Sequence, residues 1–99
     1  MPVPDYQSLM LPLLRFVAEK NVETSTSEAV EGLAKILSMK DEDLNAMLPS
    51  GTQFTFFNRI SWAAMYMKKA CLIETTRRGY YRITNVGMNF LGHSPKLSM

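Results

Sequence analysis

The sequence predicts an α+β fold, mostly α-helical, with one β-hairpin or a small three-stranded sheet. Apolar residues between positions 55 and 70 recur every three and four residues, the spacing of one helix face. The period then changes to two in residues 72–75 and 80–83, on either side of Arg77-Arg78-Gly79, which is typical of a hairpin. A basic helix followed directly by a basic hairpin is the pattern of a recognition helix and its wing. It predicts a winged-helix domain, a helix-turn-helix variant.

Size and composition indicate one soluble globular domain. The chain has 99 residues, 46% of them hydrophobic and 20% charged, which argues against disorder and against a second core. No run approaches the roughly 18 apolar residues of a membrane span, so we expect no membrane association. The single cysteine and the lack of a secretion signal indicate a reducing, cytoplasmic location. We expect the domain to occupy residues 1–93, with a linker or tail at 94–99.

The first predicted helix begins at Tyr6 and extends to about residue 19. Asp5 precedes it and can cap its free amide groups. Pro12 lies inside the pattern, and since proline lacks an amide proton, the helix is expected to kink or restart there. Residues 21–24 are too short for an independent strand but suit an edge pairing with the hairpin.

The second predicted helix follows a capping box formed by Ser25 and Glu28, whose side chains satisfy each other's exposed amides. Its inward residues are expected to be Val30, Leu33, Ala34 and Leu37. Gly32 costs such a helix about 1 kcal/mol relative to alanine, which predicts close packing of a neighbour at that position.

A short acidic segment follows, with Ser38 as a weaker cap. Its inward residues are expected to be Leu44, Met47 and Leu48, and Pro49-Ser50-Gly51 ends it. This connection is longer than the roughly 3–4 residues that join a minimal helix-turn-helix. It favours a winged-helix domain with an inserted helical turn.

The long helix at 55–70 is expected to bury Phe57, Ile60, Ala64, Met67 and Cys71 on one stripe. Trp62 lies at the edge of this stripe, and core packing is the more common fate of a lone tryptophan. After the hairpin, Thr84 is the expected N-cap of a last helix. Its residues Val86, Phe90 and Leu91 are predicted to close over the core.

Charge is distributed unevenly along the chain. Residues 1–54 carry four basic and eight acidic groups, a net charge of −4, whereas residues 55–99 carry seven basic groups and one acidic group, a net charge of +6. Such asymmetry indicates a polyanion-binding face. The alternative is an acidic half that neutralises a basic half within the fold.

The predicted DNA-binding residues lie on the outward face of the long helix and on the hairpin. Arg59 and Asn58 lie near the helix N-terminus, which enters the major groove in helix-turn-helix docking, and both can pair with base edges. Lysines near the helix C-terminus suit phosphates, or else they complement the helix dipole. The full set is Asn58, Arg59, Ser61, Lys68, Lys69, Arg77, Arg78 and Arg82.

We predict no catalytic residue, metal ligand or cofactor. The single histidine, His93, lies in the expected tail, and nothing in the sequence indicates a base or metal beside Cys71. Asp41, Glu42 and Asp43 are explained as favourable charge on the first turn of a short helix.

These residues resemble a known family. The motifs are Ser50-Gly51, Phe57-Asn58-Arg59, Trp62-Ala63, Met67-Lys68-Lys69-Ala70, Leu72-Ile73-Glu74, Arg78-Gly79-Tyr80-Tyr81, Ile83-Thr84 and Gly87, with Leu11-Pro12-Leu13-Leu14 near the start. Together they are similar to the N-terminal domain of Mrr-type restriction endonucleases. The resemblance implies a winged-helix domain that places a separate, C-terminal nuclease domain on modified, typically methylated, double-stranded DNA. That nuclease is not among these 99 residues, so we expect this chain to bind and not to cut.

An alternative from another class stays open. Folds do not dictate functions, so the winged helix could serve protein–protein interaction or homodimerisation without DNA. Eight methionines and the aromatic residues Phe54, Phe56 and Phe57 could supply an apolar contact surface. A stand-alone nuclease would require metal-dependent cleavage by this chain alone.

Overall fold

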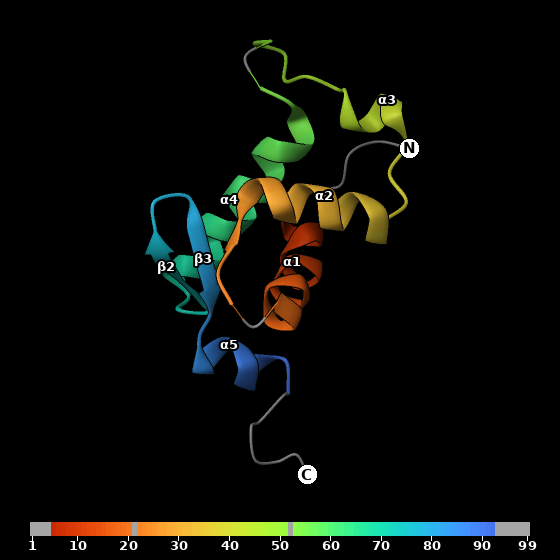
Figure 1. Ribbon diagram of the computed structural model, residues 1–99. Helices are drawn as coiled ribbons and strands as arrows, with labels where there is room; N and C mark the ends of the chain where they lie inside the picture. The colour runs from red at the N-terminus through yellow and green to blue at the C-terminus, as the bar shows by residue number, and fades with distance from the viewer. Residues whose placement is uncertain (1–4, 21, 52, 93–99) are drawn as a thin grey trace.

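The computed structural model describes residues 5–20, 22–51 and 53–92 and has an α+β fold (Figure 1). The three strands form one antiparallel sheet in the order β1-β3-β2. The predicted fold class is therefore confirmed, as is the edge pairing of the segment before the second helix. The predicted tail at 94–99 and His93 lie outside the described residues. The elements are α1 (Tyr6–Lys20), β1 (Thr24–Ser25), α2 (Thr26–Ile36), α3 (Asp41–Leu44), α4 (Thr55–Lys69), β2 (Ile73–Arg77), β3 (Tyr80–Ile83) and α5 (Asn85–Phe90).

The core lies between α1, α2, α4 and the inner face of the sheet. Figure 1 shows α3 and α5 at opposite ends of the molecule, with α4 running between them beside the hairpin. The fully buried side chains include Leu9, Leu13, Leu14, Val17, Leu33, Phe56, Ile60, Met67 and Ile73. Burying each such side chain contributes roughly 1.5–3 kcal/mol, so α4 is held mainly by its inward face.

The helix α1 is continuous through Pro12. The Oδ1 atom of Asp5 accepts a hydrogen bond from the amide of Ser8 at 2.8 Å, which confirms the predicted cap. Of the two expected outcomes at Pro12, a restart does not occur, and Leu9 before the proline and Leu13 after it are both buried in the core.

The start of α2 also agrees with the prediction of a capping box. The Ser25 hydroxyl accepts the Glu28 amide at 3.1 Å, and the Glu28 carboxylate accepts the Ser25 amide at 3.0 Å. Gly32 faces the ring of Phe16, and a Cβ atom at this position would overlap that ring. The predicted close packing at Gly32 is confirmed, and the neighbour is α1.

The end of α4 differs from the prediction. Cys71 is exposed and adopts a left-handed conformation with φ of 65°, so its expected burial on the helix stripe is wrong. The amide of Leu72 bonds to the Met67 carbonyl at 2.9 Å, and that of Cys71 to the Lys68 carbonyl at 3.0 Å. This pair of bonds is the Schellman motif. The helix therefore ends before Cys71, and the chain turns directly into β2.

Three further expectations about burial are wrong. Phe56, not Phe57, is the fully buried aromatic at the start of α4, and Trp62 is 44% exposed rather than part of the core. With Phe56 inside, Ala63 follows it inward, and the helical rotation of 100° per residue carries Trp62 to the outside. Met47 is also exposed, because α3 ends at Leu44 and the chain continues as a non-helical connection in which Met47 and Phe54 form an isolated antiparallel bridge.

The helices α3 and α5 show the remaining differences. Lys40 precedes α3 without a side-chain cap, and Ser38 instead ends α2 in a left-handed conformation. Thr84 caps α5 as predicted, accepting the Gly87 amide at 3.1 Å. Val86 and Phe90 are exposed, because the inward contact of this short helix is made at Gly87, where a Cβ atom would collide with the Leu72 carbonyl.

Within the described ranges, none of the helices combines the length and the hydropathy that crossing a lipid bilayer demands.

Candidate functional site

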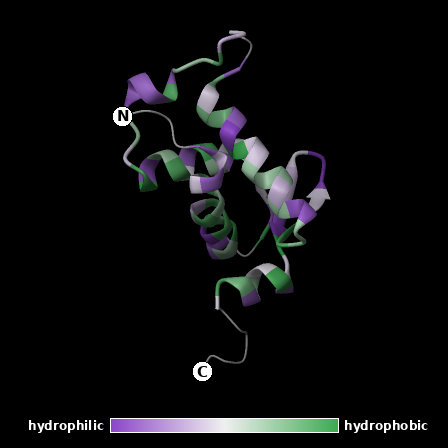
Figure 2. Cartoon of the chain, turned by 180° about the vertical axis from the view of Figure 1, so that it is seen from behind, coloured by the Kyte–Doolittle hydropathy of each residue, from purple (hydrophilic) through white to green (hydrophobic). Residues whose placement is uncertain are grey.

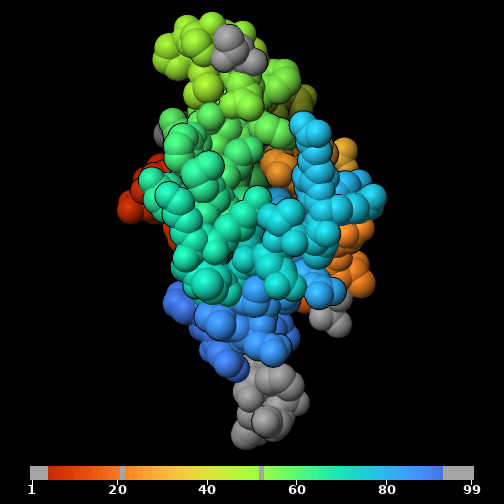
Figure 3. Space-filling model, turned by 90° about the vertical axis from the view of Figure 1, so that its left-hand side faces the viewer, coloured from red at the N-terminus to blue at the C-terminus, as the bar shows by residue number. Residues whose placement is uncertain are grey.

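One face of the molecule is formed by α4 and the β2–β3 hairpin together. Figure 3 shows the two elements side by side across this face, with α5 below them. Their closeness follows from the tight turn after α4, and Lys68 spans the junction with its Nζ atom 5.6 Å from the ring centroid of Tyr81 in β3. All eight predicted site residues lie on these elements.

The predicted base readers near the start of α4 are involved in contacts within the fold. The Nδ2 atom of Asn58 donates to the Gln53 side chain at 2.9 Å. Arg59 is half-buried beside the start of α1. Hydrogen bonds from Ser8 lower the pKa of Asp5, and the positive charge of Arg59 lowers it further. The hydrogen bond to Gln53 orients the Asn58 side chain before any ligand arrives.

The later part of α4 is more open. Ser61 is half-buried, and both lysines are exposed. The Nζ atom of Lys69 lies 5.9 Å from the ring centroid of Tyr66, a cation–π contact. Both ammonium groups thus lie near an aromatic ring while the lysines remain exposed, which leaves their charge available to an anion.

The hairpin arginines have three different environments. The Arg77 guanidinium forms an ion pair with Glu23 at 2.8 Å and lies 4.0 Å from the Tyr80 ring centroid. Arg82 pairs with Glu74 across the two strands at 3.0 Å. Arg78, at the tip, is exposed. In Figure 2 this tip is hydrophilic, as is the distant α3.

Trp62 and Met65 are further surface residues of this face: Met65 is expected from the helical spacing to face outward, whereas Trp62 is expected in the core. Both are 44% exposed, and they occupy the outward side of α4 between Asn58 and Lys69. Trp62 also ends an aromatic row, in which Tyr66 stacks on Tyr6 at 4.9 Å and Trp62 tilts against Tyr66 at 6.1 Å. The sequence signal for Trp62 lies in Phe56. With Phe56 as the inward aromatic residue, the rotation of the helix places Trp62 on the outside.

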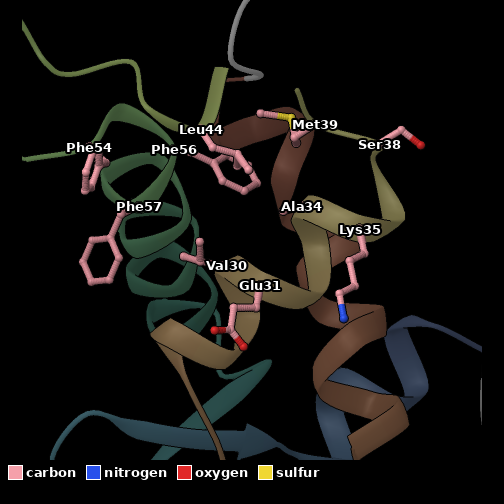
Figure 4. Close-up of a pocket in the computed structure, with 10 residues that line it drawn as sticks. All are labelled: Val30, Glu31, Ala34, Lys35, Ser38, Met39, Leu44, Phe54, Phe56 and Phe57. Atoms are coloured by element: carbon pink, nitrogen blue, oxygen red, sulfur yellow. The ribbon is translucent and has the colours of Figure 1, made fainter. Parts of the chain in front are cut away.

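A separate apolar groove of about 700 Å³ lies between α2, α3 and the start of α4 (Figure 4). Figure 4 shows that Val30 and Ala34 come from α2, and Phe54 and Phe57 from the start of α4. Phe54 is 49% exposed. All three phenylalanines expected to form a contact surface therefore line this groove, and Phe56 also belongs to the core.

Metal ligands do not gather in the part of the chain that the structure describes, where no group of three or more histidine, cysteine or acidic side chains could hold an ion.

The fold and this face define a class of protein: a small α+β domain that presents a helix and an adjacent basic hairpin on one surface. The chain belongs to the Mrr N-terminal domain family, whose model matches residues 6–93. The predicted resemblance is confirmed.

The chain is similar to a type IV methyl-directed restriction enzyme of Escherichia coli (strain K12), EcoKMrr, with 29% identity over 96 residues. This alignment covers 97% of the chain but only 31% of the relative, so the chain spans about a third of that enzyme's length. No solved structure matches the chain significantly.

Proposed function

We propose that this chain is a winged-helix module that binds double-stranded DNA, with α4 in the major groove and the β2–β3 hairpin as a wing on the backbone. The element order supports this proposal, since three helices, α1, α2 and the short α3, precede α4, and the hairpin follows it directly. In helix-turn-helix docking the recognition helix enters the groove with its N-terminal residues toward the bases.

The observation that carries the proposal is the open positive charge of this face. Lys68, Lys69 and Arg78 are exposed, and none of the three forms an ion pair within the described ranges. Each can therefore neutralise a phosphate without first breaking an internal pair, and phosphate neutralisation supplies most of the non-specific affinity of such proteins.

The proposed contacts divide between base edges and backbone. Asn58, Arg59 and Ser61 lie at the end of α4 that meets base edges, and Lys68, Lys69 and the hairpin arginines suit phosphates. Trp62 and Met65 offer apolar surface between them, of the kind that contacts a C5-methyl group in the major groove. This surface supports methylated DNA as the ligand, in line with the methyl-directed relative.

In the full-length protein we infer a cytoplasmic restriction enzyme whose nuclease lies in a separate domain. The support is that the matched family is an N-terminal domain and that the chain spans 31% of its relative. On this proposal the chain binds DNA and does not cleave it.

Titration of a short duplex into the chain at several salt concentrations tests the proposal. The logarithm of the affinity should fall linearly with the logarithm of the salt concentration, by about 0.9 for each neutralised phosphate. Paired methylated and unmethylated duplexes test base modification. Absence of binding at low salt, or binding that is insensitive to salt, contradicts the proposal.

The apolar groove favours a second candidate, a protein-interaction or homodimerisation module. Phe54 and Phe57 line it beside α2, and exposed apolar surface of this kind marks contact sites. A mass that rises with concentration in sedimentation, without DNA binding, would favour this function. The variant Phe54→Ala should then restore the monomer.

A further inference from the structure

The two arginines at the hairpin tip are neighbours in sequence but differ in structure. Arg78 is exposed at the turn. The Arg77 guanidinium is held by Glu23, with Nε donating to Oε2 at 2.9 Å and Nη2 lying 2.8 Å from the same oxygen. The proposed function treats the hairpin as one DNA-binding wing, but this difference separates the roles of its arginines.

Glu23 reaches the tip from outside the hairpin. It directly precedes β1, which pairs with β3 and not with β2. Its other oxygen accepts a hydrogen bond from the Thr76 hydroxyl at 2.7 Å. Thr76 lies at the irregularity in the β2–β3 register between Thr75 and Arg77. The carboxylate thus joins the start of β1 to the β2 end of the turn, across the strand between them.

We call the contacts of Glu23 with Thr76 and Arg77 the clamp. It is held by more interactions than an ordinary surface ion pair. Its side chains are 62% and 35% exposed for Arg77 and Glu23, and isolated exposed pairs contribute little. Here the carboxylate also accepts the Thr76 hydroxyl, and the Tyr80 ring lies 4.0 Å from the guanidinium. The hydrogen bond from Thr76, together with Arg77, holds the pKa of Glu23 below its ordinary value. Glu23 therefore stays charged at neutral pH.

We propose that Glu23 is a positioning residue that fixes the hairpin tip and withholds Arg77 from DNA, so that Arg78 is the tip's phosphate contact. This inference rests on the proposed DNA-binding function. A phosphate that approached Arg77 would have to displace a carboxylate already bound to two of its nitrogens, whereas a phosphate at Arg78 displaces only water. The irregularity in the β2–β3 register at Thr76, which the same carboxylate contacts, sets the direction in which Arg78 projects.

The salt dependence of duplex binding tests the roles of the two arginines. Arg78→Ala should reduce the slope of affinity against salt by about 0.9, whereas Arg77→Ala should change it little. Glu23→Gln releases Arg77 and should steepen the slope by about 0.9, so that a fourfold rise in salt costs about 3.5-fold more affinity than in the unmodified chain.

Two controls separate the clamp from a general charge effect. Glu19→Gln makes the same change in net charge at an exposed position on α1 and should leave the slope nearly unchanged. In the double variant Glu23→Gln with Arg77→Ala, the steepening should disappear, because the released group is gone. Circular dichroism checks that each variant is folded.

A measurement without DNA completes the test. Exchange of the Arg77 Nε proton with water, followed by NMR, should be slow in the unmodified chain and several-fold faster in Glu23→Gln. Fast exchange in both overturns the clamp. A reduced slope in Arg77→Ala, with no effect of Glu23→Gln, overturns the withholding of Arg77. Slow exchange without any duplex binding instead contradicts the proposed function, and the assignment to Arg78 falls with it.

Discussion

The basic groups of α4 and those of the hairpin differ in what surrounds them. Lys68 and Lys69 of α4 lie over tyrosine rings and stay exposed. Arg77 and Arg82 of the hairpin each contact a carboxylate, Glu23 and Glu74 respectively. The net charge of +6 in residues 55–99 therefore overstates the free positive charge of this surface. Neutralisation of the basic half by the acidic half therefore occurs at Arg77, which pairs with Glu23, whereas the polyanion-binding face stays a prediction.

The two regions also depend on the core to different extents. The inner face of α4 contributes Phe56, Ile60, Ala63, Ala64 and Met67 to it, whereas β2 is buried only at Ile73. The helix therefore supplies more of the core than the hairpin does, whose buried residues are Ile73 and Tyr81, and the hairpin tip is held by polar contacts.

Truncating the buried side of α4 should have the largest effect. Phe56→Ala removes a side chain that is 1% exposed and should lower the free energy of unfolding by about 3–5 kcal/mol, as in other cores. Urea unfolding measures the change. Phe54→Ala is the matched control, since it removes the same ring from a position that is 49% exposed. Equal losses for the two would contradict the assignment of Phe56 to the core.

Removing the two lysines of α4 should affect binding next most strongly. The double variant Lys68→Ala with Lys69→Ala should reduce the salt slope for duplex binding by about 1.8, the sum of two phosphate contacts. A tenfold loss of affinity corresponds to about 1.4 kcal/mol, and we expect at least that loss at low salt. The pair Arg77→Ala with Arg82→Ala serves as the comparison. If it weakened binding more than the lysine pair does, the contrast between helix and hairpin would be wrong.

Replacing the buried tyrosine of β3 should cause a smaller change, a loss of stability. Tyr81 is 2% exposed, and its hydroxyl lies 3.4 Å from that of Thr26. Tyr81→Phe should lower the free energy of unfolding by about 1 kcal/mol, the typical net value of one hydrogen bond. Urea unfolding at neutral pH measures it. An unchanged free energy of unfolding would mean that this contact contributes nothing.

Because of Tyr81, we also expect the stability of the fold to depend on pH in the alkaline range. Burial raises the pKa of the Tyr81 hydroxyl above its ordinary value of 10.0. The folded state then binds the proton more tightly than the unfolded state, so stability is fully present below pH 10 and falls as the pH rises above it. Thermal unfolding from pH 8 to 11 should show a steeper decline for the unmodified chain than for Tyr81→Phe.

Breaking the exposed ion pair between Glu74 of β2 and Arg82 of β3 should have the smallest effect. Glu74→Gln breaks the contact with Arg82, whose two side chains are 51% and 58% exposed. The free energy of unfolding should change by less than about 0.5 kcal/mol, the scale of solvated pairs. A larger change would mean that the pair orders the hairpin as the Glu23 contact does.

Short-range patterns determined most of the architecture. The caps at Asp5, Ser25 and Thr84, the long helix and the hairpin all follow from residues within four positions of each other, the range over which helices and turns form their hydrogen bonds. The charge asymmetry is likewise a property of the chain order. These features could be predicted because their causes are local.

Packing between distant segments determines which charges are paired and whether Trp62, at the edge of the apolar stripe of α4, faces solvent. The bonds from Glu23 to Thr76 and Arg77 join residues 53 and 54 positions apart, a separation that no local pattern reveals. The exposure of Trp62 depends on the rotation of α4, which follows from the burial of Phe56 in the core. The sequence thus determined the elements and their charge, and long-range packing determined which of those charges face solvent.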